Sequence, residues 1–89
     1  ADTYYNIGLI YFNQAIEIDK VRQTSAAKKR QMENLYRQSL PYLEKYRAMA
    51  PEKKQRWMSP LYTIYLNLNM GKEFDEIDKL INEYRRNNK

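Results

Sequence analysis

Side chains that carry out acid–base, nucleophilic or metal chemistry near neutral pH are scarce in this sequence. Its 89 residues include no histidine and no cysteine. Histidine is the usual general base, the commonest metal ligand and the group that activates serine or cysteine nucleophiles, and cysteine thiolates are the other frequent ligands of structural zinc. We therefore expect no catalytic residue, no metal ligand and no cofactor, and we interpret the chain as a protein that is not an enzyme.

Positive charge is the second feature with chemical consequences, and it is concentrated in one part of the chain. Residues 20–56 contain eleven lysines and arginines and three acidic residues, a net charge of +8, whereas the remainder has a net charge of −3. Such a segment can neutralise the phosphates of a nucleic acid or of another polyanion. The residues expected to do so are Lys28, Lys29, Arg30 and Arg37.

A basic segment is more often a solvated helix face that keeps a protein soluble. The compact motifs of nucleic-acid binders are also absent, because the sequence has no glycine-rich clamp loop, no zinc-finger spacing and no strand with paired aromatic residues. We therefore expect a protein or peptide partner in preference to a nucleic acid. Polyanion binding through residues 20–56 is the alternative.

Helices must position these side chains, because glycine occurs twice and proline three times while strong helix formers dominate between them. Apolar residues recur at three- and four-residue steps, and this periodicity predicts four helices at about 3–22, 25–50, 52–69 and 73–86. Thr24 and Ser25 offer capping hydroxyls for the second helix. Gly71 is expected in the left-handed conformation that ends the third helix. The predicted fold class is all-α.

The length of 89 residues allows one small domain. No apolar run approaches the roughly 20 residues that a membrane-spanning helix needs, so no membrane span is expected. Because the chain begins with Ala1 rather than methionine, we expect a fragment or a processed product of a longer protein. The sequence does not indicate the compartment.

Two sets of residues resemble the signature of the tetratricopeptide repeat, a helix-turn-helix unit that stacks into binding solenoids. The set that matches the first helix of the repeat consists of Tyr4, Ile7, Gly8 and Tyr11. The set that matches the second helix and its closing proline consists of Ser39, Leu43, Tyr46 and Pro51. The resemblance implies a single domain over residues 1–89, a superhelix of four antiparallel helices in about two hairpins.

The two hairpins should differ in length and openness. Tyr4 and Ser39 are 35 residues apart, further than in the family consensus, so the first hairpin, residues 1–51, is expected to be elongated. The second hairpin, residues 52–89, matches less well. Its large first residue is either Trp57 or Leu61. Gly8 should permit a close crossing of the first two helices, whereas Tyr65 stands at the corresponding place in the second hairpin, which predicts a more open or capping hairpin. Its last helix repeats the spacing of Ser39, Leu43 and Tyr46 with Ile77, Ile81 and Tyr84.

The resemblance also implies where a partner would bind, because ligands of this family lie on a concave face formed by the first helix of each unit. The corresponding positions are Asp2, Tyr5, Leu9, Phe12 and Asn13 in the first unit and Ser59, Tyr62, Leu66, Asn69 and Met70 in the second. We predict partner contacts at Tyr5, Leu9, Phe12, Asn13, Tyr62, Leu66 and Asn69.

Five of these seven residues are aromatic or aliphatic and none is cationic, so an apolar or amphipathic peptide suits them better than a C-terminal carboxylate. The expected function is a protein-interaction scaffold that binds through its first and third helices. Docking of further repeats of the parent chain, or formation of a homodimer, would cover the same apolar surface.

Overall fold

The computed structural model describes residues 2–20 and 25–87, and these residues form four α-helices. They are α1 (Asp2–Asp19), α2 (Ala26–Met49), α3 (Lys54–Asn67) and α4 (Gly71–Asn87). The described residues contain no β-strand, and the prediction of an all-α fold is confirmed. None of the described helices is both long and apolar enough to cross a membrane.

The start of α2 is capped as predicted by Ser25, whose Oγ accepts a hydrogen bond of 3.2 Å from the backbone N–H of Lys28. This bond satisfies one of the backbone donors that a helix leaves unpaired in its first turn. The capping hydroxyl predicted at Thr24 and the predicted end of the first helix at Arg22 lie outside the described residues.

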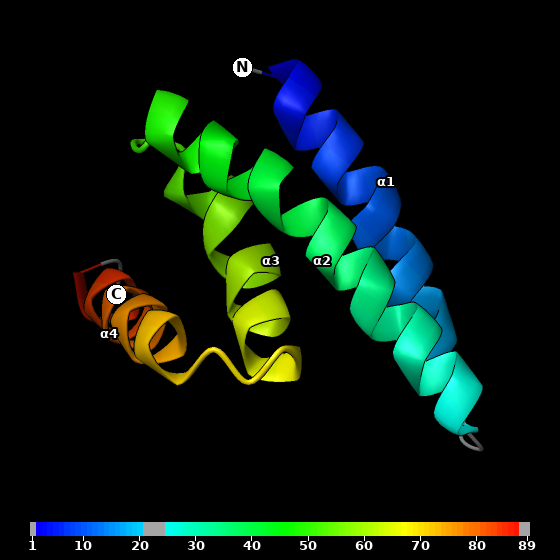
Figure 1. The fold of residues 1–89 in the computed structure, drawn as a ribbon. Coiled ribbons are helices and arrows are strands. Elements are labelled where there is room, and N and C mark those ends of the chain that lie inside the picture. Colours follow the sequence, from blue (N-terminus) through cyan, green and yellow to red (C-terminus); the bar gives the residue numbers. More distant parts are fainter. Residues whose placement is uncertain (1, 21–24, 88–89) are drawn as a thin grey trace.

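The first two helices lie side by side and run in opposite directions (Figure 1). Gly8 and Ser39 meet at their interface, where Ser39 Oγ donates a hydrogen bond of 2.7 Å to the carbonyl oxygen of Gly8. A Cβ atom at position 8 would lie 2.8 Å from Leu43 Cγ, too close for any residue except glycine to fit without a shift. The predicted close approach of the two helices at Gly8 is confirmed.

The remaining signature residues divide between the core and its edge. Leu43 and Tyr46 of α2 are fully buried with Ser39. The α1 residues Tyr4, Ile7 and Tyr11 are half-buried. Of these, Tyr11 stacks on Tyr42 at 6.1 Å between ring centroids, and Tyr4 lies under the ammonium group of Lys45 at 4.9 Å. Pro51 is exposed in the turn between α2 and α3.

The core continues from α2 into α3, which packs against α2 on one side and against α4 on the other. Trp57, Leu61 and Ile64 of α3 are buried. Tyr65, which stands where the repeat has glycine, is also buried, and its hydroxyl donates a hydrogen bond of 2.9 Å to Glu44 Oε2. Burial, together with this hydrogen bond, raises the pKa of Tyr65 above its ordinary value. The phenol therefore ties α3 to α2.

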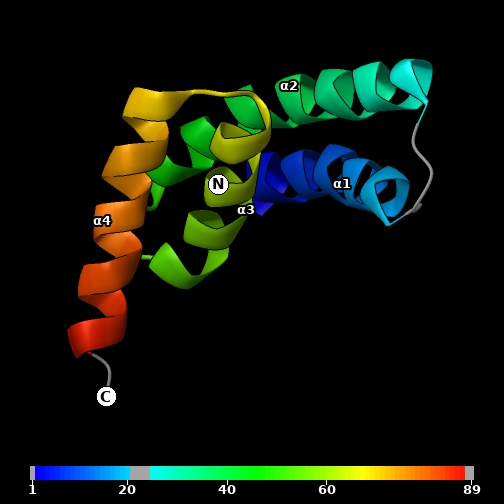
Figure 2. The same ribbon diagram turned by 90° about the horizontal axis from the view of Figure 1, so that it is seen from below.

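The prediction of a left-handed glycine after α3 is wrong, because Gly71 is the first residue of α4 and Asn69 has the positive φ, 56°. The N–H of Asn69 donates to the carbonyl of Leu66 at 3.3 Å, and the N–H of Met70 donates to that of Tyr65 at 2.9 Å. These are the two hydrogen bonds of a Schellman motif, which asparagine supports because it tolerates the left-handed region. After this turn α4 folds back against α3 (Figure 2).

Candidate partner-binding groove

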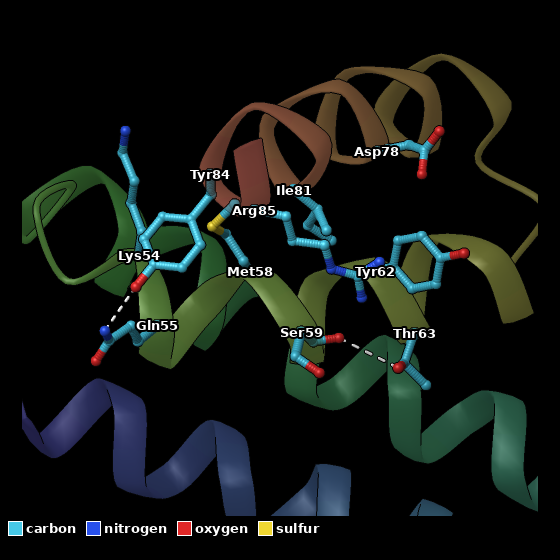
Figure 3. A pocket seen from close by; sticks show the side chains of 10 residues that line it. All are labelled: Lys54, Gln55, Met58, Ser59, Tyr62, Thr63, Asp78, Ile81, Tyr84 and Arg85. Carbon is cyan, nitrogen blue, oxygen red and sulfur yellow. Dashed lines mark hydrogen bonds between the residues drawn. The ribbon is translucent and has the colours of Figure 1, made fainter. Parts of the chain in front are cut away.

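A groove with a volume of about 580 Å³ opens between α3 and α4 (Figure 3). The α3 side of this α3–α4 groove includes Lys54, Gln55, Met58, Ser59 and Tyr62, and the α4 side is formed by Asp78, Ile81, Tyr84 and Arg85. Its volume lies within the range of about 300–1,000 Å³ that is usual for ligand sites in proteins.

Apolar side chains form the floor of the α3–α4 groove and polar groups lie at its rim. Met58 is 5 % exposed, whereas Tyr62, Ile81 and Tyr84 are half-buried. Gln55 Nε2 donates a hydrogen bond of 2.6 Å to the hydroxyl of Tyr84. An apolar floor with a few polar groups around it can take up an apolar side chain and fix the orientation of the segment that carries it.

Two charged side chains mark the ends of this surface. Asp78 lies at one end and Lys54 at the other, and the side chain of Arg85 extends across the groove towards Tyr62 (Figure 3). Lys54 and Arg85 are exposed and Asp78 is half-buried. The charged groups of the groove thus comprise two cations and one carboxylate.

A smaller cavity of about 200 Å³ continues this surface towards the turn between α3 and α4. The rings of Tyr62 and Phe74, 4.8 Å apart between centroids, bridge α3 and α4 between the two hollows. The side chain of Leu66 lines the smaller cavity and is 52 % exposed. Together the two hollows make a surface that extends along α3.

The second-unit positions predicted to face a partner all line one of these two hollows. Ser59 and Tyr62 line the larger, and Leu66, Asn69 and Met70 line the smaller. Helical spacing accounts for this, because Ser59, Tyr62 and Leu66 are three and four residues apart and so share one face of α3. Asn69 lies just beyond the last residue of α3 and lines the smaller hollow with Leu66.

The first-unit positions lie elsewhere, on the α1–α2 hairpin, and line neither hollow. Tyr5 packs against Tyr46, with ring centroids 4.9 Å apart, and Phe12 packs against Tyr36 at 5.9 Å. Leu9 is half-buried and Asn13 is exposed. Two of the four predicted α1 residues therefore already contact aromatic rings of α2.

The start of α3 joins α1 through Arg56. Its Nη1 atom donates a hydrogen bond of 3.2 Å to Asp2 Oδ1 and one of 3.4 Å to the hydroxyl of Tyr46, and its guanidinium lies 5.6 Å from the ring centroid of Tyr5. The hydrogen bond to Tyr46 is the largest influence that raises the pKa of Arg56, and Asp2 adds to it. Beyond this contact α1 and α3 diverge (Figures 1 and 2).

The basic residues of 20–56 have two different surroundings. Lys28, Lys29, Arg30 and Arg37 are exposed on α2. Arg37 approaches Glu33 at 3.9 Å. Three other cations lie over aromatic rings: Lys45 over Tyr4, Arg47 over Trp57 and Arg56 over Tyr5. Part of the positive charge is therefore used in packing the helices.

Neither the α4 wall of the groove nor Lys54, Gln55 and Met58 on its α3 side was predicted from the sequence. Ile81 and Tyr84 have helical spacing in an apolar stripe, which favours a core interpretation, and Arg85 follows as one of two terminal cations. The sequence pattern that points to Ile81 and Tyr84 is the repetition of the spacing between Leu43 and Tyr46. It identifies Ile81 and Tyr84 as counterparts of packed residues but does not show that their outer edges remain open.

In comparisons with known proteins, the chain matches no protein-family model, no curated protein and no solved structure.

Proposed function

We propose that this chain is a non-catalytic interaction module that resembles a pair of tetratricopeptide hairpins and binds a peptide or protein segment along α3. One observation carries the proposal: every second-unit position to which the resemblance assigns a ligand contact lines one of two adjoining hollows. These positions come from a spacing argument that made no use of α4. Their agreement with the cavities is independent support.

The surface has the properties that peptide recognition needs. Leu66 exposes half of its side chain beside the smaller hollow, and Met58 and Ile81 offer apolar contacts in the larger one. Helices and extended segments bind such grooves by inserting successive apolar side chains into successive pockets. Two hollows on either side of the Tyr62–Phe74 pair would take two anchors of one segment.

A matched pair of variants tests the proposal. Leu66 and Met49 are both 52 % exposed, but Leu66 lines the smaller hollow whereas Met49 lines neither of the two. Peptides selected from a random phage-displayed library on the 89-residue chain are titrated by fluorescence anisotropy against Leu66→Ser and Met49→Ser. We expect Leu66→Ser to weaken binding about tenfold or more, because a buried leucine contributes about 1.5–3 kcal/mol. Met49→Ser should bind as wild type does.

The result should depend little on salt, because the contacts are mainly apolar: affinities at about 50 and 200 mM salt should agree within about twofold. Failure to select any peptide, or equal effects of the two substitutions, would contradict the proposal. Far-UV circular dichroism checks that each variant is folded. Both variants should keep the wild-type spectrum, because substitutions at exposed positions rarely change stability much.

Polyanion binding is the second candidate, and the first turns of α2 favour it. Lys28, Lys29 and Arg30 are consecutive and exposed, and the first turn of α2 has no acidic residue. Retention on a heparin column that falls steeply between about 50 and 200 mM salt would support it. Replacing these three residues with glutamine should then abolish retention, whereas Lys72→Gln and Lys79→Gln on α4 should not.

A further inference from the structure

The α1–α2 hairpin already receives a helix, because α3 begins on it. We call the residues that receive it the first docking site: Asp2, Tyr5, Tyr46 and Arg47. Three of them contact Arg56, and the guanidinium of Arg47 lies 4.6 Å from the ring centroid of Trp57. Trp57 is 2 % exposed, so the docked helix contributes a buried aromatic side chain preceded by a charged one.

The same residues have counterparts on the α3–α4 hairpin. The 38-residue interval that relates Leu43 and Tyr46 to Ile81 and Tyr84 also relates Arg47 to Arg85. In the first helices, the alignment of Tyr4 with Leu61 places Tyr62 opposite Tyr5 and Ser59 opposite Asp2. The second docking site is thus Ser59, Tyr62, Tyr84 and Arg85. All four line the α3–α4 groove (Figure 3).

We propose that the second docking site binds an amphipathic α-helix that presents a large aromatic side chain to Arg85 and carries an acidic residue immediately before that aromatic residue. The inference rests on the proposed function and specifies its partner. The first docking site is the evidence for the aromatic residue, because Arg47 stacks on Trp57 there. In the α3–α4 groove the corresponding guanidinium, that of Arg85, instead extends towards Tyr62 (Figure 3).

A difference in charge between the two docking sites favours the acidic residue. In the first, the residue before the aromatic ring is Arg56, and its carboxylate partner is Asp2. In the second, Ser59 replaces Asp2, and the groove is lined by two cations, Lys54 and Arg85, and by one carboxylate, that of Asp78, which lies at the end opposite Lys54. A charge complementary to Lys54 and Arg85 is therefore negative, and electrostatic complementarity of this kind mainly sets which partner is accepted.

Peptides derived from α3 itself test the inference, because this segment is the helix that occupies the first docking site. Three labelled peptides covering residues 51–69 are compared: the natural sequence, Arg56→Glu, and Arg56→Glu with Trp57→Ala. Each is titrated by fluorescence anisotropy against the full 89-residue chain. We expect Arg56→Glu to bind about fivefold tighter than the natural peptide. Removing the indole should weaken binding about tenfold or more.

Two neighbouring arginines provide the matched control. Arg85 lines the groove, whereas Arg86 is exposed and does not line it. In the Arg85→Glu chain the preference should reverse, so that the natural peptide binds more tightly than Arg56→Glu. The Arg86→Glu chain should keep the wild-type preference. Both positions are exposed in the last turn of α4, so neither substitution should unfold the chain.

Amide chemical shifts then locate the bound peptide. Shifts centred on Ile81, Tyr84 and Ser59 are expected, and shifts confined to the α1–α2 hairpin would overturn the inference because they mean that the peptide has displaced α3. Equal binding with and without the indole, or an unchanged preference in Arg85→Glu, would also overturn it. If library-selected peptides bind in a Leu66-dependent way while these peptides do not, the inference fails and the proposed function stands.

Discussion

Replacing the two glycines with alanine should change the stability of the chain in opposite directions. Gly8 and Gly71 both lie in helices, and alanine has the higher helix propensity by about 1 kcal/mol. Their surroundings differ. A Cβ at position 8 would lie 2.8 Å from Leu43 Cγ and 2.9 Å from its Cδ2, whereas a Cβ at position 71 would have no neighbour within 4 Å.

The magnitudes follow from this difference. Leu43 is fully buried and cannot retreat into solvent, so the added methyl group at position 8 must push α1 away from α2. Overpacking of this kind costs about 1–3 kcal/mol, and weakening the hydrogen bond from Ser39 costs about 1 kcal/mol more. Net of the helix propensity, Gly8→Ala should destabilise the chain by about 1–3 kcal/mol. Gly71→Ala should stabilise it by about 0.4–1 kcal/mol.

Urea unfolding followed by circular dichroism at 222 nm measures both changes. Truncating Leu43 provides an internal check, because in a Leu43→Ala chain the methyl group of Gly8→Ala has space, and its cost should fall by about 1 kcal/mol or more. A close α1–α2 contact at Gly8 would be contradicted if Gly8→Ala stabilised the chain as Gly71→Ala does, or if its cost were the same in both backgrounds.

Three further predictions concern single side chains. Tyr36 is fully buried and its hydroxyl has no hydrogen-bond partner among the described residues, so Tyr36→Phe should leave the free energy of unfolding at pH 7 unchanged or raise it by about 1 kcal/mol in urea titrations. Burial, with a smaller effect of the Asp19 charge, raises the pKa of Tyr36 to about 12. The free energy of unfolding should therefore be independent of this titration below about pH 10 and should fall by up to about 1.4 kcal/mol per pH unit as the pH rises towards 12. The fall should be smaller in Tyr36→Phe, which lacks the titrating hydroxyl. Ser39→Ala removes the donor to the Gly8 carbonyl and should cost about 1 kcal/mol, measured as a lower urea midpoint. Asn69→Gly should preserve the thermal midpoint of unfolding. Asn69→Val should lower that midpoint and reduce the free energy of unfolding by about 1–2 kcal/mol, because only the β-branched side chain conflicts with the positive φ.

The contact at Gly8 could be predicted from the sequence because few helix arrangements make use of a glycine inside a helix. A lone glycine inside an otherwise apolar helix loses stability unless its small size is used, and the matching small residue at Ser39 identifies the neighbour. The end of α3 could not be predicted in the same way. Asn69 and Gly71 both tolerate a positive φ, and which one adopts it depends on where the last carbonyls of α3 find donors.

Part of the α3 side of the groove was predictable from the sequence, and its α4 side was not. Spacing places Ser59, Tyr62 and Leu66 on one face of α3 whatever α4 does. Whether Ile81 and Tyr84 are core or groove wall depends on how closely α4 packs against α3, and periodicity carries no information about that distance. The stacking of arginines on aromatic rings was missed for a related reason, since each pair joins two different helices.

The first docking site separates the groups that give affinity from those that give selectivity. Arg56 and Asp2 have side chains that are 45 % and 78 % exposed, so solvent screens their ion pair and it contributes little to stability. Trp57 is almost fully buried beneath Arg47, and burying an aromatic side chain contributes several kcal/mol. The aromatic ring therefore holds the helix in place, and the exposed charges distinguish one helix from another. Because the α3–α4 groove keeps the arginine and both tyrosines but lacks the counterpart of the Asp2 carboxylate, it should retain the affinity for an aromatic anchor while accepting a helix of different charge.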